Sequence, residues 1–265
     1  MKLDILYEDN DIIVCHKAPG VASQTERSYD PDMVSMLMNH FHKSGVKNPY
    51  VGVVHRLDKP VAGVIIYGKN EKATKLLSEQ ITSHKFTKRY KAIVCGDISV
   101  LKDKVTSQKS DNSGSAISID SDNRYTLTDY LLRDAKTNTS CVVDISLSKY
   151  KSHKEVKKSS LSFSVSKKIE LAPDNPLYKE NSPYGNILSL VDIELLTGRH
   201  HQIRVQFSHA GFPLWGDMRY SPYAKDLGQR KGVALCAYSL TIKHPVTKKE
   251  ITFDIEPRNS IFSYI

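Results

Sequence analysis

The sequence predicts an α+β protein with a mixed, mostly antiparallel central sheet and flanking helices. Strand patterns outnumber helix patterns along the chain, and the first two strands follow each other as a hairpin. Hydrophobic residues make up 40% of the 265 residues, which is enough for a sizeable core. We expect one domain over residues 1–265, with a variable polar and lysine-rich insertion at about 97–186.

The N-terminal residues predict a β-hairpin. Leu3, Ile5 and Tyr7 place apolar side chains at every second position, and the apolar run at 12–15 follows four acidic or amide residues. Pro19-Gly20 then turns the chain out of the hairpin.

Two amphipathic helices are predicted from apolar residues at helical spacing. The first covers 32–42, with Asp30 as its N-cap and Pro31 in its first turn. The second follows Asn70, a residue type that caps helices well, and ends before Lys85.

A charged loop between two apolar runs is the main candidate for chemistry. The runs cover 51–54 and 64–67, and the loop at 55–60 reads His-Arg-Leu-Asp-Lys-Pro. Its carboxylate, Asp58, stands between two cations, which favour the ionised form and suit a nucleophile or a base. A solvated turn aspartate would look the same if this loop were seen alone.

The next predicted strand, 88–96, carries a second candidate residue. Tyr90, Ala92 and Val94 share one face of this strand because side chains alternate. Periodicity leaves two roles open for Tyr90, which are packing in the core and an active-site phenol.

The insertion begins with a shift to polar residues. The stretch 97–124 has few apolar residues and predicts a long loop with no more than a short hairpin, and 173–183 is another predicted loop. A predicted strand near 161–165 is flanked in sequence by lysines. These lysines either protect a sheet edge or contact RNA; they are Lys149, Lys151, Lys154, Lys157, Lys158, Lys167 and Lys168.

A strand, a turn and a helix form the second landmark. The apolar run 187–196 predicts a strand that Thr197-Gly198 breaks, and a helix follows that ends at Gly211. Its polar face carries His201, Arg204 and Ser208. Two closing strands are expected at 233–242 and 251–255.

The net charge indicates a polyanionic partner. The formal charge is +9 and the isoelectric point is near 9.2, which favours nucleic acid over an anionic membrane. A basic protein without such a partner stays possible. The four cysteines are scattered, which argues for reduced thiols in a cytoplasm and against disulfides or a zinc site.

Other catalytic patterns are missing from the sequence. It holds no cluster of metal ligands, no glycine-rich phosphate loop and no Ser-His nucleophile pattern. The N-terminal residues do not read as a signal peptide, and no run has the length of a membrane span. The residues therefore point to a cofactor-free reaction on a nucleic acid, with no metal and no membrane.

Three segments, in this order, resemble the signature segments of the RluA-type RNA pseudouridine synthases: HRLDKPVAGVIIYGK, KRYKAIVCG and LLTGRHHQIRVQFSHAGFPLWGDMRY. The opening LDILYEDNDIIVCHKAPGV resembles the first hairpin of that family, and GVALCAYSLTIKHP resembles its closing strands. The resemblance spans almost the whole chain and is weakest between Asp97 and Asn186.

This resemblance implies a largely antiparallel sheet with an RNA cleft across its middle. Asp58 would be the catalytic aspartate that attacks or deprotonates the ribose of the target uridine. Tyr90 would be the phenol that stacks near the base and takes the carbon 5 proton. Arg204 would be the basic residue paired with the aspartate, and Arg56 the arginine beside the flipped-out base.

The chain also departs from the family pattern. Many relatives read Thr-Ser-Gly after the aspartate loop, where this chain has PVAG at 60–63. Many relatives carry a small N-terminal RNA-binding module, whereas we expect this chain to start directly with the catalytic hairpin. The lysine-rich middle segment would then substitute for that module.

Three functions follow as hypotheses. The first is an active, monomeric, cytoplasmic synthase that modifies rRNA or tRNA without a cofactor. The second is an inactive RNA-binding or RNA-chaperone protein on the same scaffold, and the third is a nucleoside hydrolase that releases free uracil. The joint presence of Asp58, Tyr90 and Arg204 favours the first.

Overall fold

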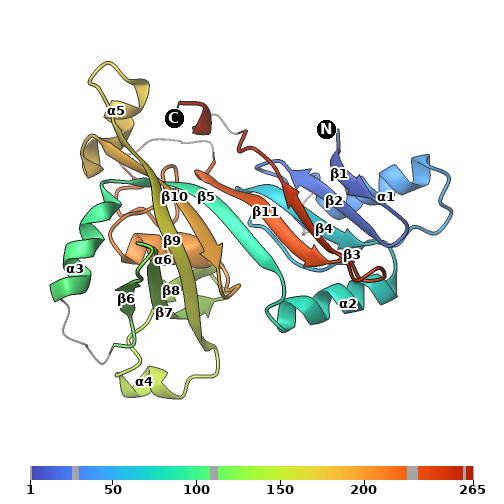
Figure 1. The fold of residues 1–265 in the computed structure, drawn as a ribbon, viewed down its shortest axis with the longest axis horizontal. Helices are drawn as coiled ribbons and strands as arrows, with labels where there is room; N and C mark the ends of the chain where they lie inside the picture. The colour runs from blue at the N-terminus through green and yellow to red at the C-terminus, as the bar shows by residue number, and fades with distance from the viewer. Residues whose placement is uncertain (1, 26–29, 108–112, 226–231, 259–260, 265) are drawn as a thin grey trace. The chain divides into compact units, whose positions relative to one another are not determined.

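The computed structural model describes residues 2–25, 30–107, 113–225, 232–258 and 261–264 (Figure 1). The chain forms two compact units, of which the first comprises residues 1–90 and 236–260 and the second 91–235 and 261–265. It passes between them inside strand β5 (Thr87–Cys95) and returns inside strand β11 (Leu235–Lys243). The single domain over the whole length stays a prediction.

The first unit is built on a sheet in which the strand order is β1-β2-β4-β11. The predicted hairpin forms β1 (Asp4–Glu8) and β2 (Ile12–Lys17), which pair antiparallel. Strand β4 (Ala62–Gly68) pairs with β2 and with the short β3 (Gly52–Val53), and β12 (Glu250–Asp254) pairs with β11. All of these pairs are antiparallel except β4 with β11, which is parallel.

Helices α1 (Met33–Lys43) and α2 (Glu71–Thr82) confirm both predicted helices. The Asn70 side chain accepts the Ala73 N–H and caps α2 as expected. The cap of α1 was predicted wrongly, because Asp32 accepts the Ser35 N–H at 2.9 Å. Either aspartate suits a cap chemically, but Asp30 instead accepts a hydrogen bond from Lys59.

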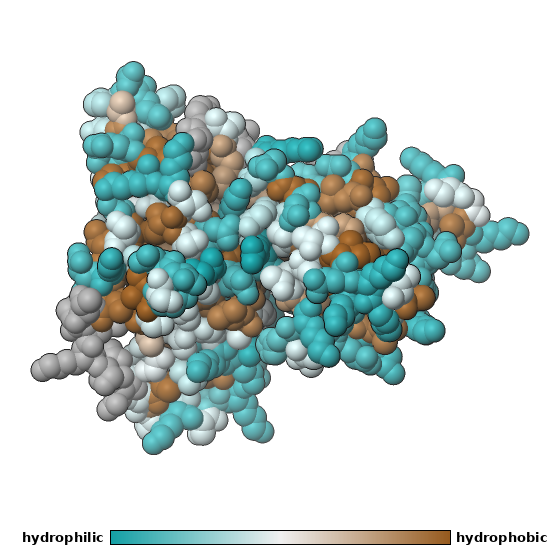
Figure 2. Space-filling view, in the orientation of Figure 1, coloured by the Kyte–Doolittle hydropathy of each residue, from teal (hydrophilic) through white to brown (hydrophobic). Residues whose placement is uncertain are grey.

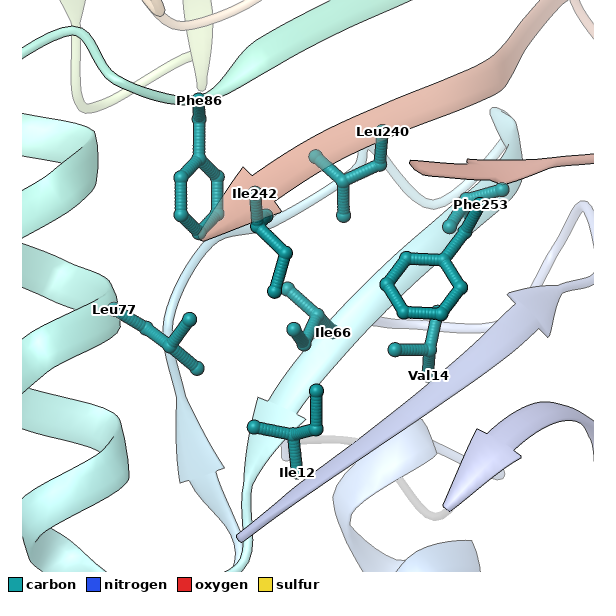
Figure 3. Packing of buried hydrophobic residues seen from close by; sticks show 9 residues of the cluster. Ile12, Val14, Ile66, Leu77, Phe86, Leu240, Ile242 and Phe253 are labelled. Atoms are coloured by element: carbon teal, nitrogen blue, oxygen red, sulfur yellow. The ribbon is translucent and has the colours of Figure 1, made fainter. Parts of the chain in front are cut away.

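A hydrophobic cluster joins α2 to the strands of the first unit (Figure 3). Leu77 of α2 is fully buried and points toward Ile66 of β4, while Phe253 of β12 closes another side. Truncating a buried leucine of this kind to alanine costs about 2–5 kcal/mol of unfolding free energy. This packing gives the loop before β4 a rigid support.

Gly63 lets β4 and β11 approach each other closely. Its φ is +142°, and a Cβ atom there would lie 2.4 Å from the carbonyl oxygen of Ala237. Any side chain would therefore collide with the β11 backbone. This close contact explains why a glycine stands at position 63, at the start of strand β4.

The second unit holds a sheet with strand order β5-β10-β9-β7-β6, and β8 pairs with β7. Antiparallel pairing joins β10 to β9 and β9 to β7, and β7 to both β6 and β8. The bounds are β6 (Ala116–Ile119), β7 (Tyr125–Asp134), β8 (Thr139–Val142), β9 (Val156–Glu170) and β10 (Ile187–Leu195).

Helices of the second unit are α3 (Leu101–Ser107), α4 (Ser148–Lys151), α5 (Pro176–Asn181) and α6 (Gln202–His209). Short 3-10 helices cover Ile98–Val100, Ser182–Tyr184 and Phe262–Tyr264. Phe207 of α6 lies 5.1 Å from Phe163 of β9, which in turn stacks on Tyr125 of β7 at 5.0 Å between ring centroids. This aromatic packing fixes α6 on the sheet.

Two predicted loops contain helices instead. The stretch 97–124 contains helix α3, in addition to β6, which forms a short hairpin with β7 as the prediction allowed. Ile98 and Leu101 at the start of this stretch are fully buried although the residues around them are mostly polar. The stretch 173–183 forms α5, whose Leu177 is also buried. In both cases a few buried side chains outweigh the polar composition around them.

The predicted α+β class is confirmed by the predominance of antiparallel pairs and the small number of helices. Hydrophobic residues lie in small separate groups among hydrophilic ones on the face shown in Figure 2. Within the described part of the chain, no helix has the length and hydrophobicity needed to cross a membrane.

Candidate active site

Asp58 lies in the loop that connects β3 to β4. The loop ends in a turn in which the Val61 N–H donates to the Asp58 carbonyl oxygen at 2.9 Å. The Asp58 side chain is half-buried, whereas Arg56 is exposed. The predicted arrangement, a carboxylate on a loop between two strands, is what the first unit contains.

The backbone on both sides of Asp58 is held by the segment that follows β2. Ser23 Oγ donates to the Leu57 carbonyl oxygen at 2.7 Å and accepts the Leu57 N–H at 3.0 Å. The Gly20 N–H donates to the Lys59 carbonyl oxygen at 2.7 Å. Three hydrogen bonds therefore fix the two residues that flank Asp58, and they restrict the motion of its carboxylate.

Lys17, at the end of β2, is the buried cation of this site. Its side chain is fully buried, and its ammonium donates to the carbonyl oxygens of Val21 at 2.8 Å and of Lys59 and Ala18 at 3.2 Å. Burial lowers the pKa of Lys17 to about 8, and the Asp58 charge acts in the opposite direction. The ammonium thus ties the aspartate loop to the first hairpin.

Sequence reasoning placed Asp58 between the cations Arg56 and Lys59, and that arrangement stays a prediction. The Lys59 ammonium forms an ion pair with Asp30 at 2.7 Å. Lys17 was not singled out because it is the last residue of an apolar strand, where a charge usually points to solvent. The Pro19-Gly20 turn directly after it was the only signal that the chain folds back there.

His55 anchors the start of the same loop. Its Nε2 accepts the Ile66 N–H at 3.3 Å, so this nitrogen carries no proton. Burial lowers the pKa of His55 to about 3, and the charge of Lys88 adds to this effect. The imidazole is therefore neutral at physiological pH and acts here as a hydrogen-bond acceptor for strand β4.

Tyr90 lies on the buried face of β5, as alternation predicted. Its side chain is 6% exposed. Burial raises the pKa of Tyr90 above its usual value, and the Asp58 charge raises it further. The two predicted site residues of the first unit are thus near enough to interact electrostatically, and the phenol is neutral at physiological pH.

Arg204 is buried on α6 in the second unit. Its Nε and Nη2 groups each donate to the Asp217 carboxylate at 2.7 Å. Asp217 is buried as well and also accepts the N–H groups of Arg219 and Tyr220. The predicted pairing of Arg204 with Asp58, a residue of the first unit, stays a prediction.

An aromatic shell packs around Arg204. The Tyr220 ring centroid lies 5.1 Å from its guanidinium carbon, and the Tyr220 hydroxyl lies 2.6 Å from Nδ1 of His201. His201 precedes α6 with a positive φ of 54° and stacks on His200 at 3.7 Å. Sequence reasoning put His201 on the helix, and it did not identify Asp217 or Tyr220, which lie after the helix and have no periodic relation to it.

One group of three potential metal ligands occurs among the described residues, formed by Asp9, Asp11 and His244. The Asp9 oxygens already accept hydrogen bonds from Tyr7, from His244 Nε2 and from two backbone N–H groups. Nδ1 of His244 accepts two backbone N–H groups as well. This cluster therefore braces the first hairpin against the β11–β12 turn.

Comparison with known proteins adds a family match. A family model described as RNA pseudouridylate synthase matches residues 11–209. An uncharacterized RNA pseudouridine synthase of Bacillus subtilis is 29% identical over 96% of this chain and 69% of its own length. The tRNA pseudouridine synthase C of Haemophilus ducreyi is 27% identical over 95% of this chain and 90% of its own length.

A solved structure shows the same fold. Human RNA pseudouridylate synthase domain containing 1 aligns with a TM-score of 0.66 and 21% identity, over 97% of this chain and 84% of that one. At this identity the likeness concerns the fold alone.

Proposed function

Because this chain belongs to the RNA pseudouridylate synthase family, we propose that it isomerises uridine in rRNA or tRNA to pseudouridine with Asp58 as the catalytic carboxylate. The reaction breaks the bond between N1 of uracil and C1′ of ribose and forms a new bond from C5 to C1′. A proton leaves C5 and one is gained at N1, so no oxidant or reductant is needed.

The support for Asp58 is the way its loop is held. Ser23, Gly20 and Lys17 fix the backbone on both sides of the aspartate, and the carboxylate itself is half-buried. A nucleophile or base that is fixed before the substrate arrives loses little entropy on reaction. Asp58 attacks C1′ or removes a ribose proton, and uracil detaches and rotates.

Tyr90 takes the C5 proton in this proposal. A neutral phenol can accept the C5 proton on its oxygen only if it gives its own hydroxyl proton to another acceptor in the same step. The Asp58 carboxylate, whose charge acts on the phenol, is suited to be that acceptor. Tyr90 and Asp58 would therefore act as one proton-transferring pair in the product-forming step.

The two arginines have binding roles in this proposal. Arg56 is exposed at the edge of the aspartate loop, and its guanidinium plane stacks in the space that the extruded uridine leaves. Extruding a base costs a few kcal/mol, and stacking of the guanidinium in the vacated space offsets part of this cost. Arg204 supplies the cation that pairs with Asp58. We further propose that the protein acts as a cytoplasmic monomer.

The test uses RNA from cells that lack the gene. Purified wild-type protein should raise the pseudouridine content of this RNA at defined positions. Asp58→Asn should keep its melting temperature and RNA affinity and form no pseudouridine, because an amide is neither nucleophile nor base. Lys59→Gln is the matched control next to it and should stay active. Pseudouridine made by pure Asp58→Asn would refute the assignment, and free uracil would indicate a hydrolase.

A further inference from the structure

A pocket of about 600 Å³ lies in the second unit beside the lysine-rich segment. Its lining comes from β7, the segment that follows β8, α4 and the start of β9, and includes Tyr130, Tyr150, Ile145, Val156, His153 and Lys151. This volume falls within the roughly 300–1,000 Å³ typical of small-molecule sites.

Two tyrosines give this pocket flat apolar walls. Tyr130 comes from β7, and Tyr150 comes from α4; both are half-buried. Within the described residues, neither hydroxyl donates to a protein group. Gly114 brings the chain close behind the first ring, since a Cβ atom there would lie 2.9 Å from Tyr130 and 2.7 Å from Ile145. The Gly114 backbone therefore packs closely against the Tyr130 ring and limits its motion.

The charges around the pocket favour an anion. The segment 144–158 carries five lysines against two carboxylates, Asp144 and Glu155. The Asp144 carboxylate is already used as acceptor of the Ser146 N–H. The Lys149 ammonium lies 4.7 Å from the Tyr150 ring centroid, so a positive charge stands directly beside an aromatic face.

Aromatic rings next to lysines are typical of protein surfaces that bind single-stranded RNA. Bases stack on the rings, and phosphates meet the ammonium groups. Lys158 pairs with Tyr130 across β9 and β7, so its side chain points to the same face of the sheet as the ring. The pocket thus offers a stacking surface with cations on two sides.

We propose that the pocket formed by Tyr130 and Tyr150 binds an unpaired base of the RNA substrate, with lysines 149, 151 and 158 on the adjacent phosphates. This site rests on the proposed function, because it takes the same RNA, but it uses residues other than those of the aspartate loop. It gives the lysine-rich segment a base-contacting role in addition to its charge.

The test measures binding of a fluorescein-labelled twelve-residue oligouridylate and of the same oligomer with abasic sugars. Tyr150→Leu keeps an apolar side chain and should weaken oligouridylate binding about five- to 150-fold. It should not alter the binding of the abasic oligomer. Tyr50→Leu, a change at an exposed tyrosine of the first unit, is the control and should leave both affinities unchanged.

Salt dependence separates the rings from the lysines. Tyr150→Leu should keep the slope of log affinity against log salt, whereas Lys151→Gln should reduce it by about 0.7. A second readout needs no variant: oligouridylate containing 4-thiouridine should photocrosslink to peptides that contain Tyr130 or Tyr150.

The proposal fails if Tyr150→Leu weakens both oligomers equally, because the ring would then support the lysines rather than a base. It also fails if both affinities stay unchanged and no crosslink maps to the pocket, which would leave the pocket to a protein ligand. If either result is found while the wild-type protein still forms pseudouridine, the base-binding pocket is refuted and the proposed function stands. Loss of the proposed function would instead appear as RNA binding without turnover by the wild-type protein.

Discussion

Arg204 and Asp217 form a buried, two-pronged ion pair. The guanidinium donates through Nε and Nη2 to the two carboxylate oxygens, each at 2.7 Å. Both side chains are almost completely buried. Geometry of this kind holds the plane of a guanidinium in one orientation. Asp217 is therefore a positioning residue for Arg204. Because of this ion pair, a substitution at Arg204 is expected to affect stability as well as turnover.

Arg204→Met should destabilise the protein as well as abolish turnover. The Asp217 carboxylate would remain buried without its cation, which costs about 3–5 kcal/mol. Urea unfolding measures this cost, and pseudouridine formation measures turnover. The double variant Arg204→Met/Asp217→Leu removes both charges and should regain part of the stability but no turnover, because the Arg219 and Tyr220 N–H groups still lose their acceptor. Recovery of turnover together with stability would mean that Arg204 is only structural.

Tyr90→Phe should keep the fold and RNA affinity and lose most release of tritium from uridine labelled at C5. Only the hydroxyl is removed, so the early steps at Asp58 remain possible while the C5 proton has no acceptor. Tyr67→Phe is the matched control, because that buried hydroxyl donates to the Ser23 carbonyl oxygen at 2.6 Å. It should cost about 1 kcal/mol of stability and retain tritium release. Near-normal release from Tyr90→Phe would assign Tyr90 to packing.

Lys17→Met should lower the unfolding free energy by about 1–3 kcal/mol, because carbonyl oxygens of Ala18, Val21 and Lys59 lose a buried donor. The control is Lys59→Met. That ammonium pairs with Asp30 at the surface, so its loss should cost no more than about 1 kcal/mol. Urea denaturation of both variants makes the comparison, and equal losses would contradict the burial argument.

His209 should stabilise the second unit more in acid than in base. Its hydrogen bond to Asp129, with Nδ1 3.2 Å from Oδ1, raises the pKa of His209 above its usual value. The protonated form is therefore favoured by folding. This contribution is complete below the unfolded pKa of about 6.5 and is lost as the pH rises through the folded pKa.

The measurement is the difference in melting temperature between wild type and His209→Gln. It should be largest near pH 5.5 and shrink by pH 8.5, although the half-exposed histidine keeps the effect small. His55 has a lowered pKa and therefore destabilises both proteins in acid. The difference between the two melting temperatures cancels this contribution. A difference that is constant with pH would show that His209 acts by packing alone.

The sequence alone determined the elements whose signals are local. Helix α2 follows from apolar spacing behind Asn70, and the burial of Tyr90 follows from alternation along β5. The aspartate loop could be found because the two strands that hold it flank it directly in sequence. Such features depend on residues a few positions apart, so a one-dimensional pattern contains them.

Tertiary structure decided the partners of the charged groups. Lys17 reaches the Lys59 carbonyl across 42 positions, Lys59 forms an ion pair with Asp30, which lies 29 positions earlier, and Arg204 pairs with Asp217 after its helix has ended. A long flexible side chain can point to many places, and its choice depends on which carbonyl or carboxylate the packing of strands and helices buries beside it. Burial makes an unmatched charge costly, and burial is a property of the assembled fold rather than of any stretch of sequence.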